Sequence, residues 1–456
     1  MQIEEMVQKQ RAFFRTGKTI PVKDRKIALQ RLGRAIRAHE EEIYGALKAD
    51  LNKTETESYM CEIGMTLAEL SYMLKHMEGW AKKQYKPTPL AQFSAESFTI
   101  KEPYGVVLIM SPWNYPFLLT ISPLIGALAA GNCCVVKPSA YAPATSAVIR
   151  MILRECFDEE YVLVVEGGRA ENQALLDQRF DYIFFTGGVA VGKEVMAKAA
   201  KHLTPVTLEL GGKSPCIVDK TAKIDLAAKR IVFGKLLNCG QTCVAPDYIL
   251  VERSVKEALM EAMKKWIIRM YGEDASQNPA YVKMINQKHF DRVRGLIVPE
   301  KVVFGGNWNE ETMQIAPTIL DNVTAEDAVM QEEIFGPLFP ILSVESMAEA
   351  EAFIREREKP LALYLFTQNR KLAERFLRHV PFGGGCINDT IIHLATSRMG
   401  FGGVGSSGMG SYHGKKSFDT FSHEKSIVKK HTWMDLPVRY APYDKWQEKL
   451  LRIFLR

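Results

Sequence analysis

The sequence predicts an α/β protein of two or three domains, one of them built on a doubly wound parallel sheet. From residue 104 onward, short apolar runs rich in β-forming residues alternate with segments of helical spacing. This alternation is typical of a parallel sheet with helices on both faces, and right-handed crossovers make such a domain a nucleotide-binding type. The length of 456 residues also exceeds what one compact core normally holds.

The first hundred residues divide into a helical part and an extended part. Over residues 1–80, and most clearly over 25–47, apolar residues recur at helical spacing between charged ones. From about residue 87 to 102, apolar residues stand among Ser, Thr and Lys at roughly period two, which predicts exposed strands.

Two successions of strands and helices follow. The first predicts strands at 106–110, 133–136, 162–165, 182–185 and 206–210, and helices opening near 116 and covering about 143–155, 171–178 and 189–200. The second, from about 215 to 395, includes strands at 216–218, 248–251 and 361–366 and helices at about 225–237 and 255–270. The tail after about 413 is polar and irregular, and its last residues favour a packed amphipathic helix over a membrane-surface segment.

The composition is that of an ordinary globular protein, with 47% hydrophobic and 25% charged residues. The net charge of +6 arises from 59 basic and 53 acidic residues mixed along the chain, without the basic stripe typical of nucleic-acid binding. The most apolar stretch, residues 115–130, is shorter than a membrane span and contains two prolines. We therefore expect neither a nucleic-acid partner nor an integral membrane span.

Cysteine usage and the N-terminus indicate a cytoplasmic protein. The eight cysteines are few and irregularly spaced, which argues against a disulfide scaffold. Cys239 and Cys243 lie four residues apart, but no second Cys/His pair lies nearby to complete a zinc site, so no metal is expected. Residues 1–20 lack the continuous apolar core of a secretory signal.

Two glycine motifs suggest nucleotide binding, but each has a defect. Residues 187–193 fit G-x-x-x-x-G-K, which makes a P-loop NTPase a rival hypothesis, yet Glu194 stands where a P-loop needs Ser or Thr to hold Mg²⁺. Residues 403–408 fit G-x-G-x-x-G, but too little chain follows for a dinucleotide-binding βαβ unit. The second motif is better interpreted as a tight glycine turn, and a place beside an active site remains open.

Three residues are candidates for chemistry, each with a structural alternative. Cys243 follows a Gly-Gln-Thr turn that could present its thiol to a cleft, although a lone cysteine is more often an inert core residue. Glu209 ends an apolar strand before two glycines, as a general base or as a partly exposed strand end. Asn114, between a strand and a helix, is locally favoured as an N-cap but could donate to an oxyanion.

Ordered motifs along residues 20–425 resemble the aldehyde dehydrogenase superfamily. They are Pro-Trp-Asn-Tyr-Pro, Val-Lys-Pro-Ser, Phe-Thr-Gly-Gly, Leu-Glu-Leu-Gly-Gly-Lys, Gly-Gln-Thr-Cys, Glu-Glu-Ile-Phe-Gly-Pro and Phe-Gly-Gly-Val-Gly-Ser-Ser-Gly. The stretches Asn-Cys-Gly-Gln-Thr-Cys-Val-Ala-Pro-Asp-Tyr and Gly-Met-Gly-Ser-Tyr-His-Gly-Lys-Lys-Ser-Phe resemble its class 3 branch. The resemblance implies an NAD(P)-dependent oxidation of aldehydes to carboxylic acids, without a metal.

The resemblance also assigns catalytic roles. Cys243 would be the nucleophile that forms a thiohemiacetal and then a thioester. The Asn114 amide and the Cys243 backbone N–H would bind the oxyanion. Glu209 would be the general base that activates the hydrolytic water. A CoA-acylating relative usually lacks this base, and a catalytically silent relative would have lost the nucleophile, so both remain weaker alternatives.

For the cofactor, NAD or NADP, the resemblance assigns a further set of residues. Glu333 would hold the nicotinamide ribose with Phe335 beside it, and Lys137 would bind the adenine-side ribose. The Thr186-Gly187-Gly188 turn and the following helix would face the pyrophosphate. Relatives commonly carry Glu where this chain has Ala140, so the sequence predicts that NADP is accepted as well as NAD.

For the substrate, the family analogy predicts a tunnel lined by Tyr115, Leu118, Thr242, Ile391 and Leu394. Such a lining favours medium to long aliphatic or aromatic aldehydes. The predicted organisation is a Rossmann-type cofactor domain over 1–82 and 102–207, an α/β catalytic domain over 208–412, and a small β oligomerisation element with the C-terminal tail over 83–101 and 413–456. Class 3 relatives are typically dimers, so a homodimer is expected.

Overall fold

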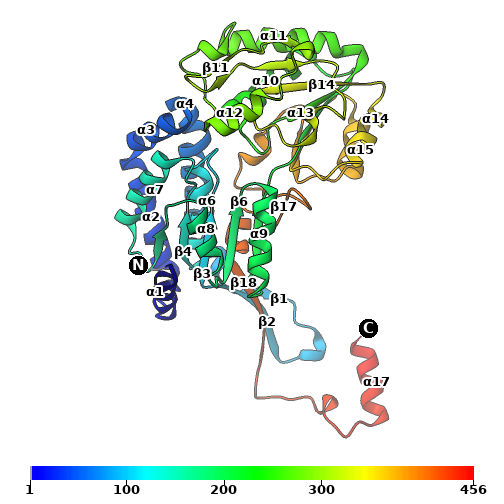
Figure 1. The fold of residues 1–456 in the computed structure, drawn as a ribbon. Coiled ribbons are helices and arrows are strands. Elements are labelled where there is room, and N and C mark those ends of the chain that lie inside the picture. Colours follow the sequence, from blue (N-terminus) through cyan, green and yellow to red (C-terminus); the bar gives the residue numbers. More distant parts are fainter. Residues whose placement is uncertain (1–2, 456) are drawn as a thin grey trace.

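The computed structural model describes residues 3–455, so Met1, Gln2 and Arg456, the ends of the predicted cofactor domain and tail, lie outside the described residues. Figure 1 shows two α/β bodies and a thin arm of strands that leads to the C-terminal helix. The predicted α/β fold class is confirmed. The domain boundaries stay predictions.

The first body is built on a six-stranded sheet in the order β17-β7-β6-β3-β4-β5. All neighbours are parallel except the edge strand β17. The bounds are β3 Val106–Met110, β4 Cys133–Lys137, β5 Val162–Val164, β6 Tyr182–Thr186, β7 Val206–Glu209 and β17 Gly408–Met409. The interior strands are continuous apolar runs because helices cover both faces of the sheet.

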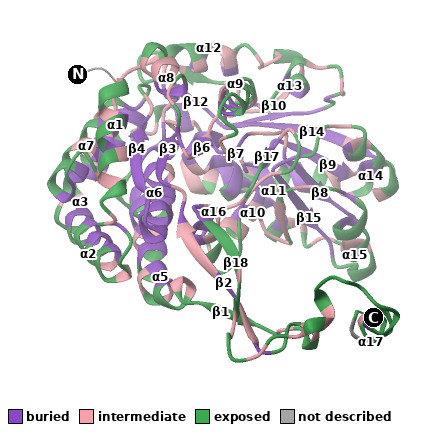
Figure 2. Ribbon diagram, turned by 90° about the horizontal axis from the view of Figure 1, so that it is seen from below, coloured by how far each residue is buried: buried purple, intermediate pink, exposed green. Residues whose placement is uncertain are grey.

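Helix α6 (Leu118–Ala130) lies at the centre of the first body, and Figure 2 shows it buried along its length. The apolar stretch at 115–130 is therefore a core helix. The other helices here are α1 Ile3–Arg15, α2 Val22–Ala38, α3 Glu40–Leu51, α4 Glu55–Ser58, α5 Gly64–Ala81, α7 Pro143–Cys156, α8 Arg169–Leu176 and α9 Val189–Ala200. Over residues 3–455, no helix combines the length and the apolarity that crossing a bilayer requires.

The second body is built on a seven-stranded sheet in the order β10-β13-β14-β9-β8-β15-β16, parallel except at β10. The bounds are β8 Pro215–Val218, β9 Tyr248–Glu252, β10 Val302–Phe304, β13 Thr318–Leu320, β14 Leu338–Val344, β15 Ala362–Phe366 and β16 Gly384–Ile387. Its helices are α10 Ile224–Leu236, α11 Lys256–Tyr271, α12 Gln287–Arg294, α13 Ala328–Gln331, α14 Met347–Arg355 and α15 Arg370–His379. A short hairpin joins β11 Trp308–Asn309 to β12 Gln314–Ile315.

The arm is an antiparallel sheet of β1 (Gln84–Lys86), β2 (Ala95–Pro103) and β18 (Ser422–Lys430). The prediction of an irregular tail was wrong, because α16 (Lys415–Thr420) and β18 lie there. Most side chains of β18 are exposed and polar, so the strand has no apolar alternation to reveal it. Its pairing with β2, from Ser422 opposite Pro103 to Lys430 opposite Ala95, defines it instead.

The last helix, α17 (Lys445–Phe454), is regular but does not pack on either α/β body. Figures 1 and 2 show it at the end of the arm, and Trp446 and Ile453 are exposed there. Its Gln447 amide donates to Pro437 O and Tyr440 O in the preceding turn. The predicted packed terminal helix is therefore wrong for this single chain, since amphipathic periodicity specifies the helix and not its partner.

A buried ion pair fixes the start of α6. Lys53 Nζ lies 2.5 Å from Glu62 Oε1, and both side chains are fully buried. Glu62 Oε2 accepts hydrogen bonds from the Phe117 and Leu118 backbone N–H groups at 2.9 and 3.0 Å. Lys53 Nζ also donates to Asn114 O at 3.0 Å. The pair thus satisfies free donors of the first helical turn and holds the loop that precedes it.

Replacing Lys53 by Met should lower the free energy of unfolding by about 3–5 kcal/mol, because Glu62 would remain as an unpaired buried charge. The double change Lys53→Met with Glu62→Leu should recover much of this loss. Lys26→Met, which breaks an exposed pair with Glu78, should cost at most about 1 kcal/mol. Denaturant unfolding compares the three variants, and a single change that costs no more than Lys26→Met would contradict the role of the pair.

Candidate active site

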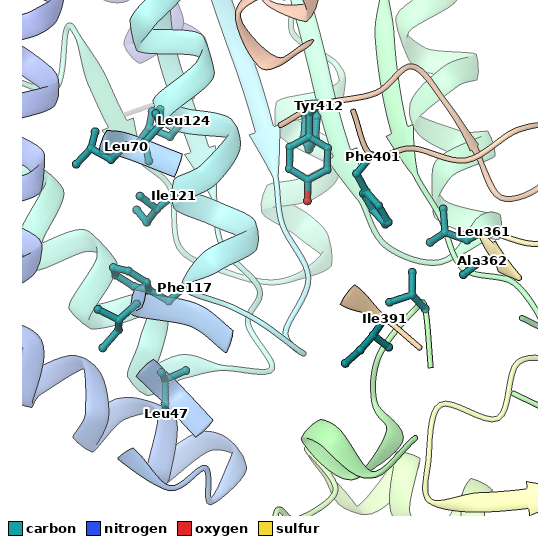
Figure 3. Packing of buried hydrophobic residues seen from close by; sticks show 14 of the residues in the cluster. Leu47, Leu70, Phe117, Ile121, Leu124, Leu361, Ala362, Ile391, Phe401 and Tyr412 are labelled. Atoms are coloured by element: carbon teal, nitrogen blue, oxygen red, sulfur yellow. The ribbon is translucent and has the colours of Figure 1, made fainter. Parts of the chain in front are cut away.

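Cys243 borders an apolar cavity of about 900 Å³ between the two bodies. The five residues predicted for a substrate tunnel, Tyr115, Leu118, Thr242, Ile391 and Leu394, all line this cavity. Figure 3 shows Ile391 near Phe401 and Tyr412, two further lining residues, across from the packed face of α6. Tyr115 and Thr242 are tied together across the cavity wall by a 2.7 Å hydrogen bond between their hydroxyls.

A strained turn presents Cys243 to the cavity. After α10, three consecutive residues, Asn238, Cys239 and Gly240, have φ values of 53°, 55° and 74°. Only glycine fits at the third position, since a Cβ there would collide with the backbone carbonyl of Gly336. Such left-handed runs are costly and persist where the surrounding structure holds them, often at functional sites.

Hydrogen bonds of the Gln241 side chain hold the same turn. Its amide donates to Asn238 O at 3.2 Å and Lys283 O at 3.1 Å, and its oxygen accepts from the Ile285 backbone N–H. The two cysteines beside it differ in environment. Cys239 is fully buried and lies 3.4 Å from the Tyr281 hydroxyl, whereas Cys243 is half-buried in the cavity wall. The inert core cysteine is thus Cys239.

Asn114 lies in the loop after β3 and reaches the Cys243 turn. Its side chain is buried, and its amide donates to Gln241 O at 3.0 Å. The locally favoured N-cap interpretation is wrong, because α6 begins at Leu118 and has no side-chain cap. The Asn114 amide carries a second hydrogen, and the backbone N–H groups of Cys243 and Val244 are directed at the Cys243 sulfur.

Glu209 ends β7 and is only 3% exposed, so the interpretation as an exposed strand end is also wrong. Neither carboxyl oxygen has a hydrogen-bond partner among the described residues. Burial without a partner raises the pKa of Glu209 well above its usual value. The glycine turn at 403–408 backs this residue, since Gly408 of β17 pairs with Glu209 and Ser407 O accepts from the Leu210 N–H.

The electrostatics bring Cys243, Glu209 and Glu333 into one site. The pKa of the Cys243 thiol is raised by burial first, and then by the charges of Glu333 and Glu209. The resting sulfur is therefore a thiol, and its ionisation needs a base close by. Burial raises the pKa of Glu209, so its carboxylate form binds a proton more strongly than a solvated carboxylate does.

The residues predicted to hold a dinucleotide form two groups. Lys137 and the Thr186-Gly187-Gly188 turn lie along one edge of the first sheet, and the other group lies across from that edge. Lys137 ends β4, and Thr186 ends β6 beside Gly187 and Gly188, where α9 begins. The Thr186 hydroxyl has no partner among the described residues. Gly187 N–H donates to Glu209 O at 3.0 Å, which ties this turn to the end of β7. Carboxyl ends of parallel strands and helix N-termini are the usual places for a dinucleotide.

Glu333 and Phe335 face this edge from the second body. Burial and the charge of Asp247 raise the pKa of Glu333 to about 8. Gly211 leaves room for it, because a Cβ there would displace the Glu333 carboxyl. Phe335 has a φ of 51° and packs edge-on against Trp113, with ring centroids 5.3 Å apart.

Two details of this edge differ from a simple phosphate site. Lys137 Nζ donates to Pro138 O at 2.9 Å and Gly167 O at 2.7 Å, so one of its three hydrogens remains for a ligand. Glu194, at the position that a P-loop gives to Ser or Thr, accepts a hydrogen bond from Gln173 of α8. The residues present fit a nicotinamide dinucleotide, through the unpartnered Thr186 hydroxyl and the Glu333 carboxyl, better than Mg-ATP.

The family model described as "Aldehyde dehydrogenase family" matches residues 1–427. This chain belongs to the aldehyde dehydrogenase family. It is an NAD(P)-dependent enzyme that oxidises aldehydes. Membership in this family removes the P-loop NTPase as a rival.

Three relatives show how close this aldehyde dehydrogenase is to known ones. It is 48% identical to 4,4'-diaponeurosporen-aldehyde dehydrogenase of Staphylococcus aureus (strain NCTC 8325 / PS 47), over 100% of this chain and 99% of that protein. It is 48% identical to the dimeric NADP-preferring aldehyde dehydrogenase of Canis lupus familiaris, over 96% and 98% of the two chains. The structure described as the substrate-bound state of Staphylococcus aureus AldH superposes with a TM-score of 0.98 at 48% identity, over 100% and 99%.

Sequence reasoning missed part of the cavity wall of this aldehyde dehydrogenase. The cavity is also lined by Phe401, which precedes the glycine turn, and by Tyr412 and His413, which follow it. Met60 and Cys61 line it from a π-helical turn, Tyr59–Ile63. A π-helical turn is common at functional sites but has no sequence signature, whereas the cluster of aromatic residues after the glycines was a visible signal.

Ala140, which is exposed beside Lys137 and next to the exposed Tyr141, leads to a prediction about the choice of cofactor. We expect the wild type to use NADP as well as NAD. Ala140→Glu should shift the ratio of kcat/KM towards NAD by roughly tenfold, about 1.4 kcal/mol, because a carboxylate repels the 2′-phosphate of NADP.

Ala140→Gln is the matched control, since it has a similar size and no charge and should shift the ratio less. Steady-state kinetics with both cofactors provide the measurement. A wild type that is inactive with NADP, or a ratio unchanged in Ala140→Glu, would show that this position does not determine cofactor preference.

Proposed function

We propose that this enzyme oxidises medium- to long-chain aliphatic or aromatic aldehydes through a thiohemiacetal and a thioester on Cys243. The observation that carries the proposal is the half-buried Cys243 thiol in an apolar cavity of about 900 Å³, together with the buried, unpartnered carboxyl of Glu209, whose charge acts on that thiol. An apolar lining binds aldehydes by removing their chains from water, in proportion to the apolar area buried. NAD(P)H production across a panel of aldehydes of graded length tests the substrate class.

The first step forms a carbon–sulfur bond. Glu209 takes the proton of the Cys243 thiol, and the thiolate attacks the aldehyde carbon. The carbonyl oxygen becomes an oxyanion that the Asn114 amide and the Cys243 backbone N–H bind. Fixed donors of this kind contribute roughly 3–4 kcal/mol each to the transition state. The Gln241 and Asn238 contacts pre-orient the Asn114 loop, so little reorganisation is needed.

The second step breaks the carbon–hydrogen bond of the thiohemiacetal and leaves a thioester. When bound, the nicotinamide ring supplies the acceptor for this hydride. Glu333 would hold the nicotinamide ribose with Phe335 beside it, and the Thr186-Gly187-Gly188 turn would face the pyrophosphate. Lys137 would bind the adenine-side ribose with its remaining N–H. No metal ligand set is part of this proposal.

The third step is hydrolysis of the thioester. Glu209 first releases to solvent the proton that it took from the thiol. It then removes a proton from a water molecule, and the water oxygen attacks the acyl carbon. The Cys243 thiolate leaves and regains a proton, and the carboxylic acid is released. A CoA-acylating enzyme would instead transfer the acyl group to a thiol, and the presence of Glu209 beside Cys243 favours hydrolysis.

We also propose that the chain forms a homodimer and resides in the cytoplasm. The canine relative is named as dimeric, which supports the first point. The backbone edge of β18, at one side of the arm sheet, offers unpaired donors and acceptors for a second chain. Sedimentation of the purified protein tests the assembly.

Cys243→Ala should lower turnover on the order of 10⁴-fold or more while leaving cofactor affinity nearly unchanged, because only the covalent step is lost. Cys239→Ala is the matched control, since that thiol is buried away from the cavity and should be dispensable for chemistry. Steady-state kinetics and cofactor binding by fluorescence report the two effects. Near-normal turnover in Cys243→Ala would refute the assignment.

Glu209→Gln should slow turnover by roughly 10²–10⁴-fold, the usual contribution of a general base. If Glu209 acts mainly in hydrolysis, stopped flow should show a burst of reduced cofactor near one per active site, with acyl enzyme accumulating. If it also takes the thiol proton, the burst itself should slow. Normal turnover would exclude both roles, and acyl-CoA formed when CoA is added to the wild type would favour the CoA-acylating alternative.

A further inference from the structure

A second cavity, of about 400 Å³, adjoins the apolar cavity that contains Cys243. The two cavities share the wall residues Met65, Leu118, Leu394, Ala395 and His413. The remaining walls of the second cavity include Glu69, Ser122, Thr396 and Ser397. We call these four residues, together with His413, the polar pocket.

The walls change from apolar to polar in the same direction on three separate segments. On α5, Met65 is followed one helical turn later by Glu69. On α6, Leu118 is followed one turn later by Ser122. In the loop after Ile392–Leu394, Ala395 is followed by Thr396 and Ser397. Residues four apart on a helix share a face about 6 Å apart, so the polar pocket continues the tunnel by about one helical turn.

Glu69, Ser122 and His413 of the polar pocket are buried, Thr396 and Ser397 are partly exposed, and these groups retain capacity for hydrogen bonds. Glu69 is 5% exposed, and its Oε1 accepts from the Gly414 N–H at 2.6 Å. A hydrogen bond from Ser397 also reaches this carboxyl. Ser122 is 1% exposed and lies on the cavity side of α6. A carboxyl has about four acceptor sites and a hydroxyl both donates and accepts, so these groups can bind a further polar partner.

The charge state of the pocket selects the kind of partner. Burial raises the pKa of Glu69, and burial lowers the pKa of His413 to about 4, so His413 is neutral near neutral pH. The wall residues of this cavity include neither Lys nor Arg. An anionic group would lack a counter-charge there, and burial disfavours the ionised form of Glu69 on which a bound cation would depend. A neutral hydroxyl matches both the acceptors and the donors.

We propose that the polar pocket is a branch of the substrate tunnel that binds a hydroxyl group carried on the chain of the aldehyde. This inference rests on the proposed function, since it assumes that the aldehyde occupies the apolar cavity next to Cys243. A hydroxyl buried in an apolar tunnel without a partner costs roughly 1–3 kcal/mol. The pocket removes this penalty at one chain position, and the enzyme thereby accepts hydroxyaldehydes that a uniformly apolar tunnel rejects.

The test measures kcat/KM for saturated aldehydes of one length with a single hydroxyl at successive positions, relative to the unsubstituted aldehyde. In the wild type, most positions should lose about tenfold or more, and one position should keep nearly the efficiency of the parent. A wild type in which every position loses efficiency alike would overturn the proposal. Analogues with an amino or carboxylate group at the spared position should be poor, and efficient turnover of either would overturn the assignment to a hydroxyl.

Variants of the polar pocket test whether its residues cause the tolerance for a hydroxyl group. Ser122→Ala and Glu69→Gln should each lower the ratio of kcat/KM between the spared hydroxyaldehyde and its parent by about threefold to tenfold. Ser254→Ala, at an exposed position in the turn before α11, is the matched control and should leave the ratio unchanged. Ser122→Ala keeps the proposal testable if Glu69→Gln fails to fold, because Glu69 also holds the Gly414 backbone. An unchanged ratio in Ser122→Ala would overturn the proposal.

Different results would contradict the polar-pocket proposal and the proposed function. If unsubstituted aldehydes are oxidised but a hydroxyl lowers kcat/KM equally at every position, the polar pocket is not a branch of the substrate tunnel. The proposed function then stands. If no aldehyde in the panel is oxidised, or if Cys243→Ala retains turnover, the proposed function itself fails.

Discussion

The arrangement of the active site depends on a buried hydrogen-bond network centred on Asn114. Its backbone carbonyl accepts from Lys53 and Asn238, and its side-chain amide donates to Gln241 O. These bonds join the loop after β3 in the first body to the turn before Cys243 in the second. A buried polar group is costly when it is unpaired, so these bonds hold the two bodies in one relative position. Without them, nothing in this network would hold the Asn114 side chain next to the turn that precedes Cys243.

Burial of ionisable groups lowers the stability of the protein, and it also changes the pKa values of the groups around Cys243. Glu209 and Glu333 lie in poorly solvated positions, and the charge of each raises the pKa of the Cys243 thiol further than burial alone does. The thiol therefore keeps its proton at rest, and the carboxyls hold protons more tightly than in water. The proton affinities of the thiol and of the two carboxyls are thus determined by burial and neighbouring charge at this site.

Packing also explains why the two adjoining cavities differ in chemical character. Helices α5 and α6 lie side by side and present residues at four-residue spacing to the same channel. An apolar residue near Cys243 and a polar one a turn later therefore produce a graded wall without any irregularity in either helix. The segment that begins at Ile391 closes the third side with the same gradient, so the tunnel is a product of three separate pieces of sequence.

The sequence alone determined the alternating β and α pattern, because the periodicities of buried strands and helices are local. It also indicated a turn before Cys243 and glycines at the start of α9, although distant residues such as Gly336 and Lys283 hold the turn in its conformation. Exposed strand β18 and the orientation of α17 could not be derived in this way, as polar periodicity specifies no partner. Strand β17 likewise exists through its pairing with Glu209 and Leu208.

Only the tertiary structure decided which of two local interpretations held at each candidate residue. Asn114 became a neighbour of Cys243 rather than a helix cap, because Gln241, 127 positions away, supplies the acceptor for its amide. Glu209 became a buried acid because β17 covers the end of its strand. Lys137 has two of its hydrogens bound to backbone carbonyls, which the sequence could not indicate. Burial and charge at a site are sums over residues distant in sequence, and that is why they are determined only when the chain is folded.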